Sequence, residues 1–203
     1  MIITIDGPAG AGKGTICKSI SEKFNLTHVD TGLYYRAIGF FFKDFENTEE
    51  NIIKVVDFIE TLDVDSFDIN KLRLEETAKN ASKIATVKEI RSSVTKKIRN
   101  DVSLISDKGA IVDGRDAGSV IFPQARCKLF ITASNEERAK RRLMELGGEK
   151  AERKDEICER DARDEKRKSS PLRPAENAFI IDTTNLTIDE ACFNAACYID
   201  EFI

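Results

Sequence analysis

Short apolar runs alternate along this chain with longer stretches whose apolar residues recur at helical spacing. Ile2–Asp6 is an apolar run of strand length that stops at a Gly-Pro pair, and it predicts a buried first strand. Within residues 13–24, Ile16, Ile20 and Phe24 recur every four residues, which predicts an amphipathic helix. Further short strands are expected at residues 28–29, 109–113, 128–133 and 179–182.

Helical spacing covers most of the remaining chain. Helices are expected over residues 33–45, 48–62, 87–106, 135–146 and 188–202, whereas residues 63–75 are too mixed to assign. Strands that alternate with helices are typical of a parallel sheet with helices packed on its faces. The predicted fold class is therefore α/β, with a five-stranded parallel sheet flanked by helices.

Composition and charge exclude several classes of protein. The chain has 203 residues, of which 41% are hydrophobic and 33% charged, as in a soluble globular protein and unlike a disordered one. The net charge of −4 argues against nonspecific nucleic-acid binding, which depends on neutralising phosphates. No apolar run approaches the roughly 18 residues of a membrane span. The first residues lack the basic and apolar regions of a signal peptide, so we expect a cytoplasmic protein.

Cysteine and histidine usage narrows the chemistry further. The five cysteines are odd in number and form no C-x-x-C pair, which favours free thiols in a reducing compartment. The chain has a single histidine, His28, which argues against a histidine-rich metal site and against a Ser-His-Asp triad, and we expect this histidine to be structural.

A glycine-rich segment follows the first predicted strand and precedes the first predicted helix. It reads GPAGAGKGT and matches the pattern G-x-x-x-x-G-K. Successive backbone N–H groups in such a loop, together with the N-terminus of the following helix, bind phosphates, and Lys13 can reach the β- and γ-phosphates of a nucleotide. ATP is therefore expected at Gly7, Pro8, Ala9, Gly10, Ala11, Gly12, Lys13, Gly14 and Thr15.

The residue after Lys13 is Gly14, so the hydroxyl of Thr15 comes one position later than in most loops of this kind. This variant resembles the phosphate loop of nucleoside monophosphate kinases. The chain contains neither the Asn-Lys-x-Asp motif that recognises guanine nor an Asp-Glu pair at the end of an apolar strand, as in motor ATPases.

Charged residues follow two of the predicted strands. Asp30 comes after the second strand, and Asp113 and Asp116 come at the end of the third, with Arg36 and Arg115 close by in sequence. Ligands of parallel sheets bind beyond the carboxyl ends of the strands. These residues therefore suit a second, anionic substrate and a metal ion beside the phosphate loop.

A charged segment before the last strand carries Arg160, Arg163, Asp164 and Arg167, which would share one face of a helix. Such a run is also typical of a solvated surface. Beside a phosphate loop it favours phosphoryl transfer, because a phosphate oxygen is already deprotonated near pH 7 and needs alignment and charge neutralisation rather than a base.

The motifs together resemble one known family. GPAGAGKGT, DTGLYYRA, VDGRDAGSVIFP, ERDARDEKR and SPLRPAENAFIIDTT occur in order over nearly the whole chain and resemble bacterial cytidylate kinases. The resemblance implies the fold of P-loop nucleoside monophosphate kinases and phosphorylation of CMP and dCMP by ATP. It also implies Mg²⁺ held by phosphates and water, with Thr15, Asp30 and Asp113 as candidate protein contacts. We expect a monomer that binds neither nucleic acid nor a membrane.

The resemblance also implies roles for individual residues. Arg138 would lie over adenine and Arg142 near the transferred phosphate. The implied catalytic residues are Lys13, Arg115, Arg142, Arg160 and Arg167. The implied CMP-binding residues are Thr31, Arg36, Ser82, Arg91, Arg115, Asp116, Arg160, Asp164 and Arg167.

The same resemblance divides a single kinase domain, residues 1–203, into functional parts. The core would comprise residues 1–30, 107–146 and 172–203, the acceptor-binding region residues 31–106, and a lid residues 147–171, hinged near Gly147-Gly148. Two alternatives stay open. One is a kinase of the same fold with another acceptor, such as UMP or a small metabolite, and the other is a noncatalytic nucleotide-binding regulatory module.

Overall fold

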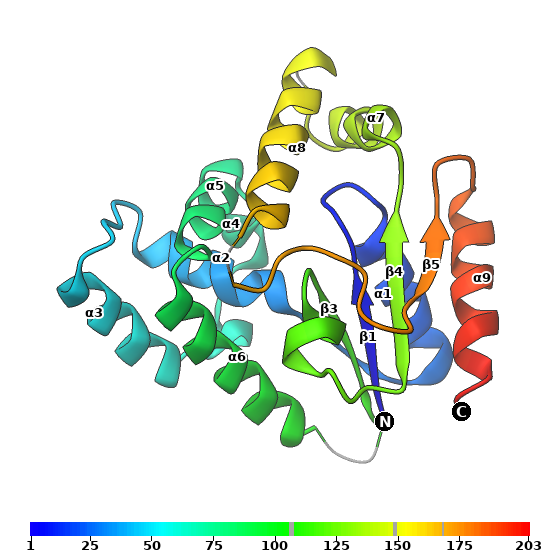
Figure 1. The fold of residues 1–203 in the computed structure, drawn as a ribbon, viewed down its shortest axis with the longest axis horizontal. Helices are drawn as coiled ribbons and strands as arrows, with labels where there is room; N and C mark the ends of the chain where they lie inside the picture. Colours follow the sequence, from blue (N-terminus) through cyan, green and yellow to red (C-terminus); the bar gives the residue numbers. More distant parts are fainter. Residues whose placement is uncertain (106–107, 148–149, 168) are drawn as a thin grey trace. The chain divides into compact units, whose positions relative to one another are not determined.

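The computed structural model describes residues 1–105, 108–147, 150–167 and 169–203. Within it the chain forms two compact units, traced in Figure 1. The first comprises Met1–Val29 and Ile105–Ile203, and the second comprises Asp30–Leu104.

The first unit is built on a five-stranded sheet. Its strands follow the order β2-β3-β1-β4-β5, and the pairs β1–β3, β1–β4 and β4–β5 are parallel. The strand bounds are Ile2–Asp6 for β1, Thr27–Asp30 for β2, Ala110–Gly114 for β3, Cys127–Thr132 for β4 and Phe179–Asp182 for β5. The predicted fold class is confirmed. In the register of β1 with β3, Asp6 lies opposite Gly114, so the residues that follow both strands share one edge of the sheet.

Two helices complete the core of the first unit. α1 (Lys13–Phe24) and α9 (Ile188–Asp200) pack against each other, and their apolar faces bury residues such as Ile20 and Ala195 with Ile3 of β1. A π-helical turn, η2 (Ala117–Ile121), follows β3 and packs on β1. α7 (Asn135–Leu146) and α8 (Lys150–Glu165) pack against each other, as Figure 1 shows.

The second unit is helical. Its elements are α2 (Thr31–Phe41), α3 (Glu49–Glu60), the 3₁₀ turn η1 (Val64–Ser66), α4 (Ile69–Leu72), α5 (Glu75–Ile84) and α6 (Lys88–Ser103). A Cβ atom at Gly39 of α2 would lie 2.6 Å from the backbone N of Ala81, so α2 and α5 pack closely only because this position is glycine. The unassigned residues 63–75, all of them described, form η1, α4 and the start of α5.

Several predicted boundaries need correction. The helix predicted over 33–45 begins at Thr31, because the Asp30 carboxylate accepts a hydrogen bond from the Gly32 N–H at 2.9 Å and caps it. The helix predicted over 87–106 ends at Ser103, and residue 106 lies outside the described residues. Gly109, expected in the third strand, has a φ of +82° and precedes it. Within the described residues, no helix is both long and apolar enough to span a membrane.

Candidate active site

The phosphate loop joins β1 to α1, as its sequence predicts. A Cβ atom at Gly7 would lie 1.9 Å from the carbonyl oxygen of Ile131 on β4, so only glycine allows the loop to leave the sheet here. Gly12 has a φ of +89° and turns the chain into α1. The loop therefore delivers its backbone N–H groups to the N-terminus of α1, an arrangement that binds phosphate.

An arginine from α7 holds the middle of this loop. The Arg138 guanidinium donates from Nη1 to the Ala9 carbonyl and from Nε to the Ala133 carbonyl, both at 3.0 Å. Its Nη2 lies 2.6 Å from the Asp161 carboxylate of α8, and the residue is only 4% exposed. Arg138 therefore links the phosphate loop to α7 and α8, and its expected place over adenine stays a prediction.

The C-terminal edge of the sheet supports the loop from a second direction. The hydroxyl of Thr183, directly after β5, donates to the Ala11 carbonyl at 3.1 Å. Arg141 donates from Nη1 to the same hydroxyl at 2.9 Å and from Nη2 to the Thr183 carbonyl at 2.7 Å. Arg142, expected near the transferred phosphate, pairs with Glu145 at 2.9 Å.

Lys13 lies among other cations. It is 6% exposed, and its Nζ donates to the Pro8 carbonyl at 3.0 Å. Burial, followed by the charge of Arg115, lowers the pKa of Lys13 to about 8, and Arg160 contributes in the same direction. The cationic side chains of Lys13, Arg115 and Arg160 thus lie close to one another, which suits the binding of an anion such as phosphate.

A buried carboxylate organises two of the arginines. One oxygen of Asp164 lies 3.4 Å from Nε of Arg115, and the other lies 3.5 Å from Nη2 of Arg167. Asp164 is 6% exposed and belongs to α8, whereas Arg167 lies beyond the end of that helix. Arg167 is therefore placed by this ion pair rather than by the helical spacing that the sequence suggested.

The carboxylates at the edge of the sheet differ in their surroundings. Burial would raise the pKa of Asp113, but the neighbouring His28 and the charges of Lys13 and Arg115 outweigh it and lower that pKa. Asp116, 4% exposed, precedes η2, and its backbone carbonyl accepts hydrogen bonds from Val120 and Ile121.

Asp6 is a site residue that the sequence analysis missed. Its two carboxylate oxygens accept from the backbone N–H groups of Ala117 and Gly118, each at 2.7 Å. It is 2% exposed, and burial raises its pKa to about 7 despite these two bonds. The sequence feature that could have identified Asp6 is its position: it is an acidic residue at the end of an apolar strand, directly before Gly7. Asp6 fixes η2, and with it Asp116, to the strand that carries the phosphate loop.

The remaining predicted acceptor residues lie in the second unit. Arg36 donates to the Leu72 carbonyl at 2.9 Å. Arg91 is 3% exposed, donates to the Ala85 carbonyl at 3.3 Å and lies 5.5 Å from the centre of the Tyr35 ring. The buried hydroxyl of Ser82 has no hydrogen-bond partner among the described residues, which suits a group that contacts a ligand.

The structure thus distributes the predicted site residues over both units. The first unit brings together the phosphate loop with Asp113, Arg115, Asp116, Arg160, Asp164 and Arg167. The second unit carries Thr31, Arg36, Ser82 and Arg91. Of the proposed metal contacts, Thr15 is exposed near the start of α1 and Asp30 caps α2.

Comparison with known proteins places these features in a family. The family model described as cytidylate kinase matches residues 3–201. The chain is 43% identical to a cytidylate kinase of Cereibacter sphaeroides, over 93% of this chain and 90% of that one. It is 41% identical to a cytidylate kinase of Methylocella silvestris, over 99% and 94% of the two chains. The crystal structure of TT1252 from Thermus thermophilus has a similar fold, with a TM-score of 0.57, 17% identity and coverage of 100% of this chain and 97% of that one.

Proposed function

Because this chain belongs to the cytidylate kinase family, we propose that it transfers the γ-phosphoryl group of ATP to CMP and dCMP. The observation that carries the proposal is the buried Lys13 of the phosphate loop, with Arg115 and Arg160 close enough to lower its pKa. Such a concentration of positive charge suits two phosphate-bearing substrates.

The reaction needs no proton-abstracting residue. An oxygen of the CMP phosphate attacks the γ-phosphorus, the bond to the β,γ-bridging oxygen breaks, and ADP leaves with that oxygen and its electron pair. Because the attacking oxygen is already anionic near pH 7, the protein has to align the two phosphates and stabilise the charge that spreads over the transferred group. Lysine and arginine side chains are suited to both tasks.

We assign the nucleotide-triphosphate side to the phosphate loop. Backbone N–H groups of the phosphate loop, Gly7–Thr15 with the exception of Pro8, bind the phosphates of ATP. The Lys13 ammonium group contacts the β- and γ-phosphates. Arg115, Arg160 and Arg167 contact the transferred and accepting phosphates. Asp164 orients two of them, Arg115 and Arg167. Arg138 and Arg142 complete the ATP side.

We assign acceptor-binding roles to residues of each unit by itself. In the second unit, Thr31 and Arg36 are assigned to the sugar and phosphate of CMP and Ser82 and Arg91 to cytosine. In the first unit, Asp116 is assigned to cytosine. A buried carboxylate at Asp116 accepts from the N4 amino group of cytosine, as carboxylates do when they read this base. The buried hydroxyl of Ser82, unsatisfied within the described protein, offers the complementary partner.

The carboxylate of Asp113, which lies near Lys13, fits Mg²⁺. Asp113 is held ionised by the positive groups around it, and carboxylate oxygen is the ligand type that Mg²⁺ prefers, usually with several waters retained. We propose that the ATP phosphates and water hold the ion, with Asp113, Thr15 and Asp30 as candidate protein contacts. When bound, Mg²⁺ would neutralise charge on the ATP phosphates.

The remaining parts of the proposal concern the whole protein. We propose that residues 31–106 bind the acceptor and that residues 147–171 act as a lid that excludes water and so limits ATP hydrolysis. The proposed hinge at Gly147-Gly148 lies partly outside the described residues, because Gly148 is one of those not described. We further propose a cytoplasmic monomer.

A coupled assay of ADP formation tests the function directly. CMP, dCMP, UMP, AMP and shikimate are offered as acceptors with ATP and Mg²⁺, and rapid turnover is expected with CMP and dCMP alone. Lys13→Ala is the matched inactive variant, with an expected loss of kcat of about 100-fold or more. Turnover with another acceptor would favour a different kinase of this fold, and ATP binding without turnover would favour a noncatalytic module.

A further inference from the structure

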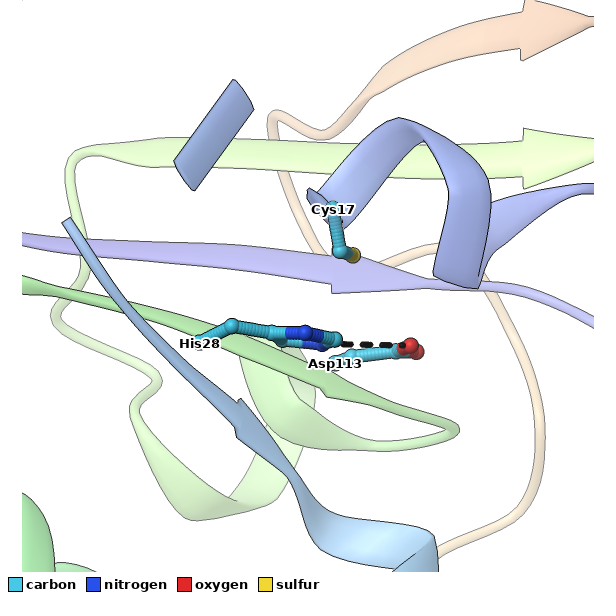
Figure 2. A group of neighbouring side chains, drawn as sticks. All are labelled: Cys17, His28 and Asp113. Carbon is cyan, nitrogen blue, oxygen red and sulfur yellow. Dashed lines mark ion pairs between the residues drawn. The ribbon is translucent and has the colours of Figure 1, made fainter. Parts of the chain in front are cut away.

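Three side chains of metal-binding types converge in the first unit. Cys17 comes from α1, His28 from β2 and Asp113 from β3, and one ligand atom from each lies within 4.8 Å of the other two. Figure 2 shows the thiol of Cys17 directed toward the His28–Asp113 pair. Cys17 and Asp113 are buried, whereas the His28 side chain is 28% exposed. Solvent therefore reaches the group from the side of His28.

The spacing of these atoms is close to that of a metal site. In a tetrahedral zinc site with bonds of about 2.0–2.3 Å, ligand atoms lie roughly 3.5 Å apart. His28 Nε2 and Asp113 Oδ2 are 3.7 Å apart, so this pair needs almost no movement. Because all three atoms lie within 4.8 Å of one another, the thiol needs to move by about 1 Å.

The charges of the ligands themselves match that of a divalent ion. Lys13 and Arg115 lie near Asp113 and would oppose an added cation. A thiolate at Cys17 and the ionised Asp113 together supply two negative charges, which match a divalent ion. The metal would take the place of the thiol proton of Cys17, so binding releases a proton.

The ligand types select the class of metal. Sulfur and imidazole nitrogen are poor ligands for Mg²⁺ and good ligands for borderline transition metals. We propose that Cys17, His28 and Asp113 bind one Zn²⁺ ion beside the phosphate loop, with a water as the fourth ligand. The set shares Asp113 with the proposed Mg²⁺ contacts and differs from them in Cys17 and His28.

Metal binding in the absence of nucleotides tests the proposal. The full chain, reduced with a phosphine, is titrated with Zn²⁺ in competition with a chromophoric chelator, and Co²⁺ is used as a spectroscopic probe. One equivalent of Zn²⁺ and a thiolate-to-cobalt charge-transfer band are expected. Because no turnover is measured, failure of this experiment leaves the proposed kinase activity untouched.

Two variants and a control locate the ion. Cys17→Ala and His28→Gln should each weaken Zn²⁺ binding by at least about 100-fold, the upper range for changes to groups that only support a metal ligand. Cys197→Ala removes an exposed thiol elsewhere and should bind as the unaltered chain does. Cys17 lies in the core, and His28→Gln, at a partly exposed side chain, serves if Cys17→Ala fails to fold. Binding of less than one equivalent by the unaltered chain, or unchanged affinity in His28→Gln, would overturn the proposal.

Discussion

The unusual acidity of Lys13 makes ATP binding dependent on pH above neutrality. Its pKa is lowered to about 8 by burial and by the neighbouring Arg115, and phosphate binding requires the protonated amine. With that pKa, the protonated fraction in the free protein falls from about nine-tenths at pH 7 to about one-tenth at pH 9. Bound phosphates hold the amine protonated, so the apparent affinity for ATP should fall about tenfold over this range.

Isothermal titration of the protein with ATP and Mg²⁺ at pH 7, 8 and 9 measures the effect. The phosphates themselves add little to it, because their last ionisation lies near pH 6. Lys13→Arg is the matched variant, since a guanidinium stays charged throughout and should give a flat profile. Asp6, with a pKa of about 7, and Cys17 also lie near Lys13, but both are retained in this variant. An equally flat profile in the unaltered protein, or an equal fall in Lys13→Arg, would refute the reasoning.

Two further predictions test neighbouring groups. Arg160→Ala and Arg167→Ala should each weaken CMP binding by at least about tenfold, the scale of a hydrogen bond to a charged group, with a smaller effect on ATP. Arg163→Ala, which lies on α8 with Arg160, is the control, and a larger loss of affinity for ATP than for CMP would place Arg160 and Arg167 on the other substrate. Asp6 keeps a proton in the folded state between about pH 4 and 7 that it loses when unfolded, so its contribution to stability falls as pH rises. Urea unfolding should therefore show that the stability of the unaltered protein relative to Asp6→Asn decreases over this range, and a constant difference would contradict the raised pKa.

The sequence predicts the frame of the first unit well because its signals are local. The bounds of β1, α1, α7 and β5 agree with the prediction, and the first three of these elements end directly before Gly7, Asn25 and Gly147. The family resemblance is confirmed by a match over residues 3–201. Local patterns are less decisive in the second unit, where α5 is largely polar and its contact with α2 depends on Gly39.

Features that depend on distant residues could not be predicted in this way. The resemblance implied roles for Arg138 and Arg142 but none for Arg141, which donates to Thr183 beside the phosphate loop. The cluster of Cys17, His28 and Asp113 is another example, because its members lie 11 and 85 residues apart in sequence and meet only when β2 and β3 pair and α1 packs on the sheet. Each of the three has an ordinary structural explanation on its own.

The choice of base offers a test of the proposed acceptor site at a single atom. Cytosine presents an amino donor at N4, whereas uracil presents an acceptor oxygen at the same place. The buried Asp116 carboxylate accepts from the amino group, but against uracil it would oppose a second acceptor. Unpaired buried groups cost about 1–3 kcal/mol each, so with more than one mismatch CMP should be favoured over UMP by at least roughly 100-fold in kcat/KM.

The variant Asp116→Asn distinguishes a role of Asp116 in recognising cytosine from a purely structural role. An amide can donate to the uracil oxygen as well as accept, so the variant should lose activity with CMP and narrow the ratio between the two nucleotides. The backbone bonds that Asp116 makes to η2 are unaffected by this substitution, because they come from its carbonyl group. Measurement of kcat/KM for CMP and UMP in both proteins gives the ratio directly. An equal loss with both nucleotides would mean that Asp116 supports Arg115 or the η2 turn rather than reading cytosine, because a positioning defect lowers turnover without regard to the base.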